Sequence, residues 1–245
     1  MIHVPTAPWA HYIFDALAWS GAALGGRWVW RHRPASVQQL SRQTEPSYYV
    51  ALALGGVFGA WAAGSFNTLR YAIPEPSHSI AGALAGAIVA VELWKWRHGV
   101  RGSTGAPFVV PLAIGIVIGR WGCLFAGLID QTYGVPTSLP WAVELGDGVG
   151  RHPVEIYESL AMAAFLAIYW PALAAGRRWA IACGFHWFVL AYATQRFAWE
   201  FLKPYPPIIG PFNVFHLIMI GLAAYALIWI VRDHGSDRPL APAAV

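Results

Sequence analysis

Three arginines of this 245-residue chain, Arg120, Arg151 and Arg196, lie within or beside apolar segments, where an unpaired cation is costly. Glu200 follows Arg196 by four residues, so the two side chains can pair on one helix. Glu158 lies near the start of another apolar segment, where it either complements the helix dipole or is a buried partner for an arginine. Because the planar guanidinium group matches a phosphate group, arginines that converge on one cavity predict a site for a phosphate ester.

The composition indicates that these charges belong to a membrane protein. The chain is 57% hydrophobic and only 11% charged, whereas a soluble domain is about 25% charged. This balance excludes an ordinary soluble domain and an intrinsically disordered chain. Two cysteines are too few for a disulfide scaffold or a thiolate metal cluster. The 14 tryptophans are typical of a protein with long membrane interfaces.

The hydrophobic pattern predicts an all-α polytopic membrane protein with seven transmembrane helices. A spanning helix needs about 20 mostly apolar residues. Seven segments meet this need, at residues 9–29, 46–65, 78–96, 107–127, 155–175, 179–197 and 211–231. We interpret residues 1–245 as a single transmembrane domain, with an outer loop at about 128–154 and a short, loose cytoplasmic tail after residue 233.

The basic residues predict the orientation of these helices. Four, three, two and two Lys or Arg residues follow the first, third, fifth and seventh segments, which makes 11 of the 16. Because cytoplasmic loops carry the excess of basic residues, the N-terminus is expected outside and the C-terminus in the cytoplasm. The other five are Arg70, Arg120, Arg151, Arg196 and Lys203. Snorkelling to the membrane interface accounts for Arg70 and Lys203, and less well for Arg120 and Arg196.

Glycine pairs predict close helix packing in the N-terminal half. Two glycines four residues apart let helix backbones approach each other. Such pairs are Gly21/Gly25, Gly55/Gly59, Gly82/Gly86 and Gly115/Gly119. We assign helix packing to all of these glycines except Gly119, which lies beside Arg120.

Several motifs resemble those of the prolipoprotein diacylglyceryl transferase family, from about Ser77 to His216. The family has a GRxGN signature, a later glycine, a Pro-Trp pair, an RHPxxxYE segment, an RxxxE pair and an HGGLxG stretch. The matching residues here are Gly119, Arg120, Gly122, Gly134, Pro140, Trp141, Arg151, His152, Pro153, Tyr157, Glu158, Arg196, Glu200, Gly82, Leu84 and Gly86. Neither the arginine block nor the RHPxxxYE block is specific alone, but their combination is.

The resemblance implies an enzyme of the bacterial inner membrane. Its reaction moves diacylglyceryl from phosphatidylglycerol to the cysteine thiol of a prolipoprotein and releases glycerol phosphate. The implied partners are phosphatidylglycerol, the lipobox segment of a prolipoprotein and membrane lipids, without nucleic acid or a cofactor. The implied catalytic residues are Arg120, Arg151, Arg196, Glu200 and His78. The implied substrate-binding residues are Gly82, Gly119, Gly122, Cys123, Asp130, Gly134, His152, Tyr157 and Glu158.

The sequence departs from the family pattern at the site. Ala81 stands where the family has histidine, Cys123 and Ala126 where it has asparagine, and Leu128 where it has glutamate. Lys203 stands at a position where arginine is common in the family. Asp130 is a candidate to replace that glutamate. Either His78 or His152 could act as the base that deprotonates the thiol, or the thiol could ionise in a strongly positive site. The alternatives are an enzyme of the same fold with another acceptor or headgroup, and a lipid binder without catalysis.

The remaining polar residues suggest other roles. Beside Arg120, Cys123 could form a covalent intermediate, although packing as a small apolar residue is the more common role of a buried cysteine. Asp15, within the first apolar segment, is expected to pair with an arginine of the site. We expect no metal, because the histidines and carboxylates form no HxxE or HxxxH pair on one helix. The last apolar segment has no lysine, which disfavours a seven-helix photoreceptor.

Overall fold

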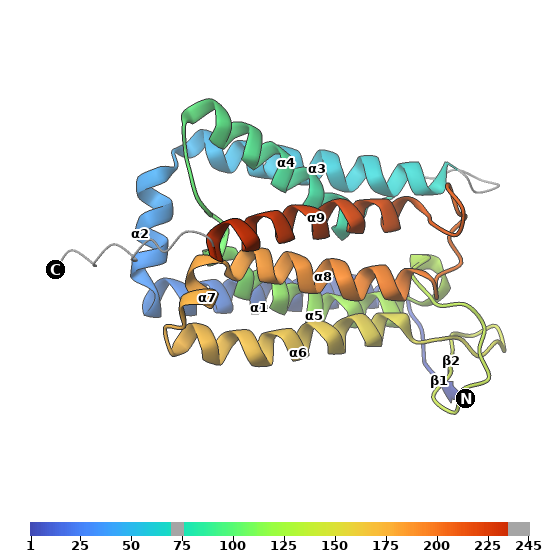
Figure 1. Cartoon of the computed structure of the whole chain (residues 1–245). Helices are drawn as coiled ribbons and strands as arrows, with labels where there is room; N and C mark the ends of the chain where they lie inside the picture. Colours follow the sequence, from blue (N-terminus) through green and yellow to red (C-terminus); the bar gives the residue numbers. More distant parts are fainter. Residues whose placement is uncertain (70–75, 235–245) are drawn as a thin grey trace. The chain divides into compact units, whose positions relative to one another are not determined.

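The computed structural model describes residues 1–69 and 76–234 and is mostly helical (Figure 1). Arg70 and nearly all of the tail expected after residue 233 lie outside the described residues. The chain forms two compact units. The prediction of a single transmembrane domain stays a prediction, because compactness does not show whether either unit folds alone.

The first unit contains Met1–Pro34 and Gly105–Pro204. In this unit α5 packs against both α1 and α6, and α6 packs against α8 (Figure 1). Its helices are α1 (Ala10–His32), α5 (Val109–Ala126), α6 (Val154–Ala174), α7 (Arg178–Ala182) and α8 (Gly184–Glu200), with 3₁₀ turns at Ala106–Phe108 and Gly127–Asp130. The predicted segment 179–197 is therefore not one helix, since it is interrupted at Cys183 between α7 and α8.

The second unit contains the described parts of Ala35–Thr104 and Tyr205–Val245. Its helices are α2 (Pro34–Gln43), α3 (Pro46–Thr68), α4 (Ile80–His98) and α9 (Val214–His234). Local chemistry explains the ends of α4: the Ser79 hydroxyl accepts a hydrogen bond from the Gly82 backbone N–H at 3.3 Å, and Gly99 ends the helix with a φ of 67°. The short helix α2 is absent from the predicted pattern because it is largely polar.

Helices coincide with most of each predicted apolar segment. Among the described residues, four helical segments are long and apolar enough to cross a membrane, at Pro46–Thr68, Ala106–Asp130, Val154–Ala174 and Val214–Arg232. The helix α8 has 17 residues, or about 26 Å at 1.5 Å per residue, against a hydrocarbon core of about 30 Å. The chain is a multi-pass membrane protein, whereas seven spans and the orientation of the termini stay predictions.

The glycine pairs of α3 and α4 bring these two helices into direct backbone contact. A Cβ on Gly82 would lie 2.2 Å from the carbonyl oxygen of Gly59, and a Cβ on Gly86 would lie 2.2 Å from that of Gly55. No side chain fits at such distances, so the packing predicted for these four glycines is confirmed.

The packing predicted for Gly21 and Gly25 is also confirmed, because a Cβ at either position would meet an isoleucine side chain of α5 at 2.7–2.9 Å. The packing predicted for Gly115 is wrong. A Cβ there would have no atom within 4 Å, because this glycine faces open space within the described structure. At Gly119 the nearest atom would be the Cβ of Ala18, at 3.9 Å.

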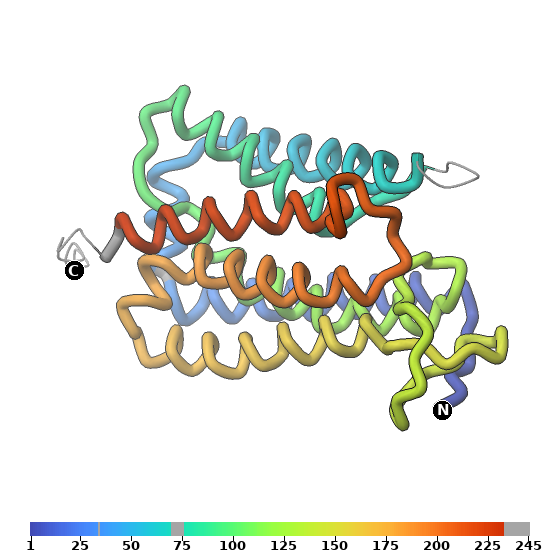
Figure 2. Tube along the Cα trace, turned by 45° about the vertical axis from the view of Figure 1, so that its right-hand side comes forward, coloured from blue at the N-terminus to red at the C-terminus, as the bar shows by residue number. Residues whose placement is uncertain are grey.

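The N-terminal residues are tied to the loop between α5 and α6. The strand β1 (Ile2–His3) pairs in parallel with β2 (Val143–Glu144), with Ile2 opposite Val143. Figure 2 shows the N-terminal end of the trace beside this loop. Around the strand pair, Val4, Leu124, Val143 and Leu145 form a small buried cluster. The loop is thus held at both ends and by a strand distant in sequence, so it is an ordered structure.

Candidate active site

Three helices of the first unit bring charged side chains together in a buried ion-pair cluster. Arg120 comes from the last turns of α5, Glu158 from the start of α6, and Arg196 and Glu200 from the end of α8. Lys203 follows α8. All five residues are at most 5% exposed.

Glu158 is the centre of this ion-pair cluster. Its Oε2 lies 2.7 Å from Nε of Arg120, and its Oε1 contacts Nη1 of Arg196 and lies 2.8 Å from Nζ of Lys203. Glu200 adds a second carboxylate, with its Oε2 2.9 Å from Nε of Arg196. The predicted partners of Glu158 and Arg196 are therefore confirmed as contacts.

The position of Lys203 differs from the prediction. Snorkelling would place its ammonium group in water, but the side chain is buried and paired with Glu158. Lys203 lies seven residues after Arg196, which is two helical turns and would place both on one face. This spacing supports the assignment of Lys203 to the site, which the family resemblance also implies.

The ion-pair cluster has an excess of positive charge. Three cations and two carboxylates give a formal charge of 3 − 2 = +1. Because burial excludes water, this charge is poorly screened and would attract an anion that entered the site. The two arginines are already oriented by carboxylates, so little reorganisation is needed when a phosphate arrives.

Hydrogen bonds between α5 and α6 hold Arg120 and Glu158 at the same height along the two helix axes. The Ser159 hydroxyl donates to the Val117 carbonyl at 2.8 Å and accepts from Nε1 of Trp121 at 3.1 Å. Ser159 neighbours Glu158, and Trp121 neighbours Arg120. These polar contacts between helices fix the register in which the arginine and the glutamate meet.

Arg151 does not join the ion-pair cluster. It forms a two-pronged ion pair with Asp147, with both N–O distances 2.7 Å, and its guanidinium lies 5.2 Å from the ring of Tyr133. Asp147 raises the pKa of Arg151, and Arg151 lowers the pKa of Asp147. The structure thus places Arg151 in the loop, where it orders the turn before α6.

Other predicted site residues have close contacts at the entry to α6 or, for Gly122, between α5 and α1. Gly134 has no room for a side chain, since a Cβ would lie 2.3 Å from the carbonyl oxygen of His152. Tyr157 accepts a hydrogen bond from Nε1 of Trp141 at 2.7 Å and lies 3.5 Å from Nδ1 of His152. Gly122 faces α1, where a Cβ would lie 2.8 Å from the Cβ of Phe14.

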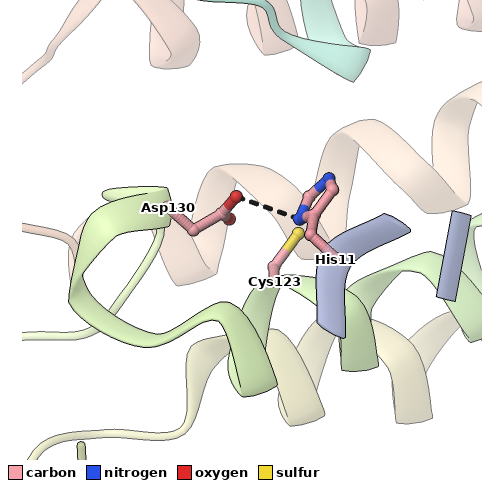
Figure 3. A group of neighbouring side chains, drawn as sticks. All are labelled: His11, Cys123 and Asp130. Atoms are coloured by element: carbon pink, nitrogen blue, oxygen red, sulfur yellow. Dashed lines mark ion pairs between the residues drawn. The ribbon is translucent and has the colours of Figure 1, made fainter. Parts of the chain in front are cut away.

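Cys123 and Asp130 meet a residue that the sequence reasoning missed. Figure 3 shows both side chains directed at the imidazole of His11, which lies at the start of α1. Nδ1 of His11 is 3.1 Å from Asp130, and Nε2 is 3.4 Å from Asp15. The prediction that Asp15 pairs with an arginine is therefore wrong, and its four-residue spacing from His11 was the available signal.

His78 and Gly82 lie in the second unit. His78 is exposed and precedes α4, and Gly82 is in contact with α3. Helix packing therefore accounts for the glycine. The functional roles predicted for both residues stay predictions.

The comparisons with known proteins agree with these motifs. A family model described as prolipoprotein diacylglyceryl transferase matches residues 48–232. The chain belongs to this family. All five members of the ion-pair cluster lie within the match, whereas His11 precedes it. No solved structure matches the chain.

Curated relatives of the family are similar over most of the chain. The phosphatidylglycerol–prolipoprotein diacylglyceryl transferase of Nitratidesulfovibrio vulgaris is 29% identical, over 76% of this chain and 74% of that protein. The enzyme of that name from Gloeobacter violaceus is 32% identical, over 70% and 67%. The one from Coxiella burnetii is 29% identical, over 89% and 87%. The family is therefore one of transferases, and it includes enzymes named for the transfer of diacylglyceryl to prolipoproteins.

Proposed function

We propose that this chain transfers diacylglyceryl from phosphatidylglycerol to the cysteine thiol of a prolipoprotein, in a bacterial inner membrane. The membership of the family and the names of the relatives support the reaction class. The buried cluster of Arg120, Arg196 and Glu158 is the observation that carries the proposal to specific residues.

The reaction requires positive charge where the leaving group forms. The thiolate sulfur attacks the glycerol carbon of the lipid that carries the phosphate, an S–C bond forms, and the C–O bond to the phosphate breaks. Glycerol phosphate then leaves with the electron pair of that bond, and the proton of the thiol passes to solvent or to the phosphate. Arg120 and Arg196 are suited to stabilise the added negative charge.

The size of this effect follows from the charge of the site. A unit charge about 4 Å from another is worth about 4 kcal/mol at an effective dielectric constant of about 20. A barrier lowered by about 4 kcal/mol corresponds to about a thousandfold in rate. Removing one arginine is therefore expected to lower turnover by about 10²- to 10³-fold, as for other preorganised charge donors.

We place the site toward the outer side of the membrane, with seven spans, the N-terminus outside and the C-terminus in the cytoplasm. The supporting observation is the asymmetry of the basic residues, of which 11 of 16 follow alternate helices. In this orientation the acceptor would approach from the compartment that contains exported prolipoproteins.

The test is release of glycerol phosphate from phosphatidylglycerol by the full-length protein in detergent, with and without a peptide that contains a lipobox cysteine. We expect release that depends on the peptide, and a peptide that gains the mass of diacylglycerol. Arg120→Ala and Arg196→Ala should each lose about 10²- to 10³-fold in turnover. The control Arg97→Ala removes an exposed arginine and should remain active.

Other outcomes would contradict the proposal in different ways. Release without the peptide would indicate another acceptor, and bound phospholipid without any release would indicate a lipid binder. Full activity of both Arg120→Ala and Arg196→Ala, with wild-type expression and monodispersity, would contradict the role of the cluster.

A further inference from the structure

Next to the ion-pair cluster, the first unit contains a second group of side chains that the proposed transfer does not use. Its members are His11 from the first turn of α1, Cys123 from the last turn of α5, and Asp130 from the end of the 3₁₀ turn that follows α5 (Figure 3). Their donor atoms all lie within 4.8 Å of one another. Imidazole nitrogen, thiolate sulfur and carboxylate oxygen are the three donor types found in protein zinc sites.

One pair of these atoms is spaced about as in a tetrahedral metal site. Zinc binds nitrogen and oxygen at about 2.0–2.2 Å and sulfur at about 2.3 Å, so neighbouring ligand atoms lie about 3.3–3.6 Å apart. Nδ1 of His11 and Oδ1 of Asp130 are already 3.1 Å apart. Sγ of Cys123 lies within 4.8 Å of the donor atoms of both residues, so its side chain would have to move toward them to complete the set.

The imidazole of His11 lies between two carboxylates. Asp15 faces Nε2 at 3.4 Å, while Asp130 faces Nδ1 at 3.1 Å. Metal-bound histidines commonly donate their second ring N–H to a carboxylate, and Asp15 is in position to accept that hydrogen bond. A metal ion bound to Nδ1 would take the place of the proton that otherwise joins Nδ1 to Asp130.

The side chains around the group favour a bound ion in two further ways. Thr132 donates a hydrogen bond to Oδ2 of Asp130 at 2.8 Å, which fixes the carboxylate and leaves Oδ1 toward His11. Nη1 of Arg120 donates a hydrogen bond to Sγ of Cys123 at 3.7 Å, which fixes the direction of the sulfur. The His11 and Asp130 side chains are 33% and 17% exposed, so the group is not sealed inside the protein.

We propose that His11, Cys123 and Asp130 bind a divalent transition metal, of which zinc fits best. The thiolate ligand disfavours calcium and magnesium, which prefer oxygen. The formal charges of a zinc ion, one thiolate and one carboxylate sum to 2 − 1 − 1 = 0. A neutral site suits a position near the membrane. The expectation of no metal was based on ligand pairs within one helix, whereas these ligands come from three elements.

Three protein ligands leave one tetrahedral position open, as in catalytic zinc sites. We infer that this position takes the sulfur of a thiol substrate, a step that rests on the proposed function. The thiol would replace a bound water, its sulfur would bond to the metal, and its proton would pass to solvent. The metal would then supply the thiolate in a chain that has Ala81 in place of the family's histidine.

The site is tested by metal binding to the full-length protein in detergent, purified without a polyhistidine tag and stripped with a chelator. Zinc chloride is added, unbound zinc is removed by gel filtration, and bound zinc is measured by mass spectrometry. We expect one zinc per chain. Cys123→Ala, His11→Gln and Asp130→Asn should each bind at least about 100-fold more weakly, because even changes behind the ligands cost about 10- to 100-fold. The matched control Cys183→Ala removes the other buried cysteine and should bind zinc normally.

Cobalt provides a second readout. A purely structural role of Cys123 would give no absorption band from a cobalt–sulfur bond. Cobalt-loaded protein should show a sulfur-to-cobalt charge-transfer band that is lost in Cys123→Ala, and a cysteine peptide should strengthen this band whereas a serine peptide should not. Absence of bound zinc, or one zinc per chain in folded Cys123→Ala, would overturn the metal site. Unchanged cobalt spectra with the cysteine peptide would overturn the thiol position. None of these readouts requires turnover, so a protein that binds zinc and transfers nothing would contradict the proposed function alone.

Discussion

Glu158→Gln should strongly destabilise the protein, because it removes the carboxylate that contacts three buried cations. The formal charge of the ion-pair cluster would rise from +1 to +2. Glu158 is fully buried, so water does not screen the loss. Removing one partner of a buried ion pair costs about 3–5 kcal/mol in the free energy of unfolding. At about 2–4 °C per kcal/mol for a chain of this size, Tm should fall by about 6–20 °C.

The measurement is thermal unfolding in detergent, followed with a dye that becomes fluorescent on reaction with thiols. Both cysteines are buried, so the dye reports the loss of packing. Glu45→Gln removes an exposed carboxylate and should change Tm by less than about 2 °C, since such substitutions stay within about 0.5 kcal/mol.

A double variant tests whether charge is the cause. Glu158→Gln with Lys203→Met leaves two arginines and Glu200, so the formal charge returns to 2 − 1 = +1. We expect this double variant to melt above Glu158→Gln alone, which is a coupling that independent sites do not show. The reasoning is refuted if Glu158→Gln melts within about 2 °C of the wild type, or if the double variant melts below both single variants.

Three further predictions concern the site, the loop and the helix packing. Arg196→Lys keeps the charge but cannot contact Glu158 and Glu200 together, so its turnover should fall by at least about 10-fold, less than for Arg196→Ala, in the glycerol phosphate assay. The backbone N–H of Gly148 and the His3 side chain lower the pKa of Glu144. The ionised carboxylate therefore stabilises the β1–β2 pairing above about pH 4.3, the ordinary pKa of a glutamate. This stabilisation is lost as the pH falls through the lowered pKa. Hydrogen exchange at Val4, corrected for its intrinsic rate, should therefore accelerate in acid, and Glu144→Gln should show the same acceleration at neutral pH. Gly82→Ala should unfold at a lower temperature than the wild type because its Cβ would meet the Gly59 carbonyl, whereas Gly115→Ala, with no atom within 4 Å, should be neutral or slightly stabilised.

The sequence was sufficient to predict contacts within one helix, and to predict that a charged residue in an apolar segment has a partner. Arg196 and Glu200 are four residues apart, and their pairing follows from helical periodicity alone. Glu158 is a carboxylate in an apolar segment, so a cationic partner was required, although its identity was not determined. The close packing at the glycine pairs of α3 and α4 followed from glycine spacing in the same way, although the spacing did not specify that these two helices are partners.

The sequence was insufficient where partners come from separate elements. His11 meets Asp130 only because α1 packs against α5, and hydrophobic pattern does not specify which helices are neighbours. Arg151 pairs with Asp147 because the loop turns at Gly146 and Gly148, both with positive φ. At Gly115 the sequence predicted a helix contact that the described structure does not contain. A glycine motif shows that two helix backbones can approach, but it does not ensure that a second helix lies there.

The parallel pairing of β1 with β2 has a consequence for the order of assembly during synthesis. The His3 and Glu144 side chains, 2.5 Å apart in the folded protein, are separated by 141 residues along the chain. At about 5–20 residues per second, the ribosome needs about 7–28 s to make the second partner after the first. During that interval the N-terminal strand has no β2 to pair with. The β1–β2 pairing therefore cannot precede the synthesis of α5 and of the loop that follows it, so the N-terminus stays unpaired until more than half of the chain has been made.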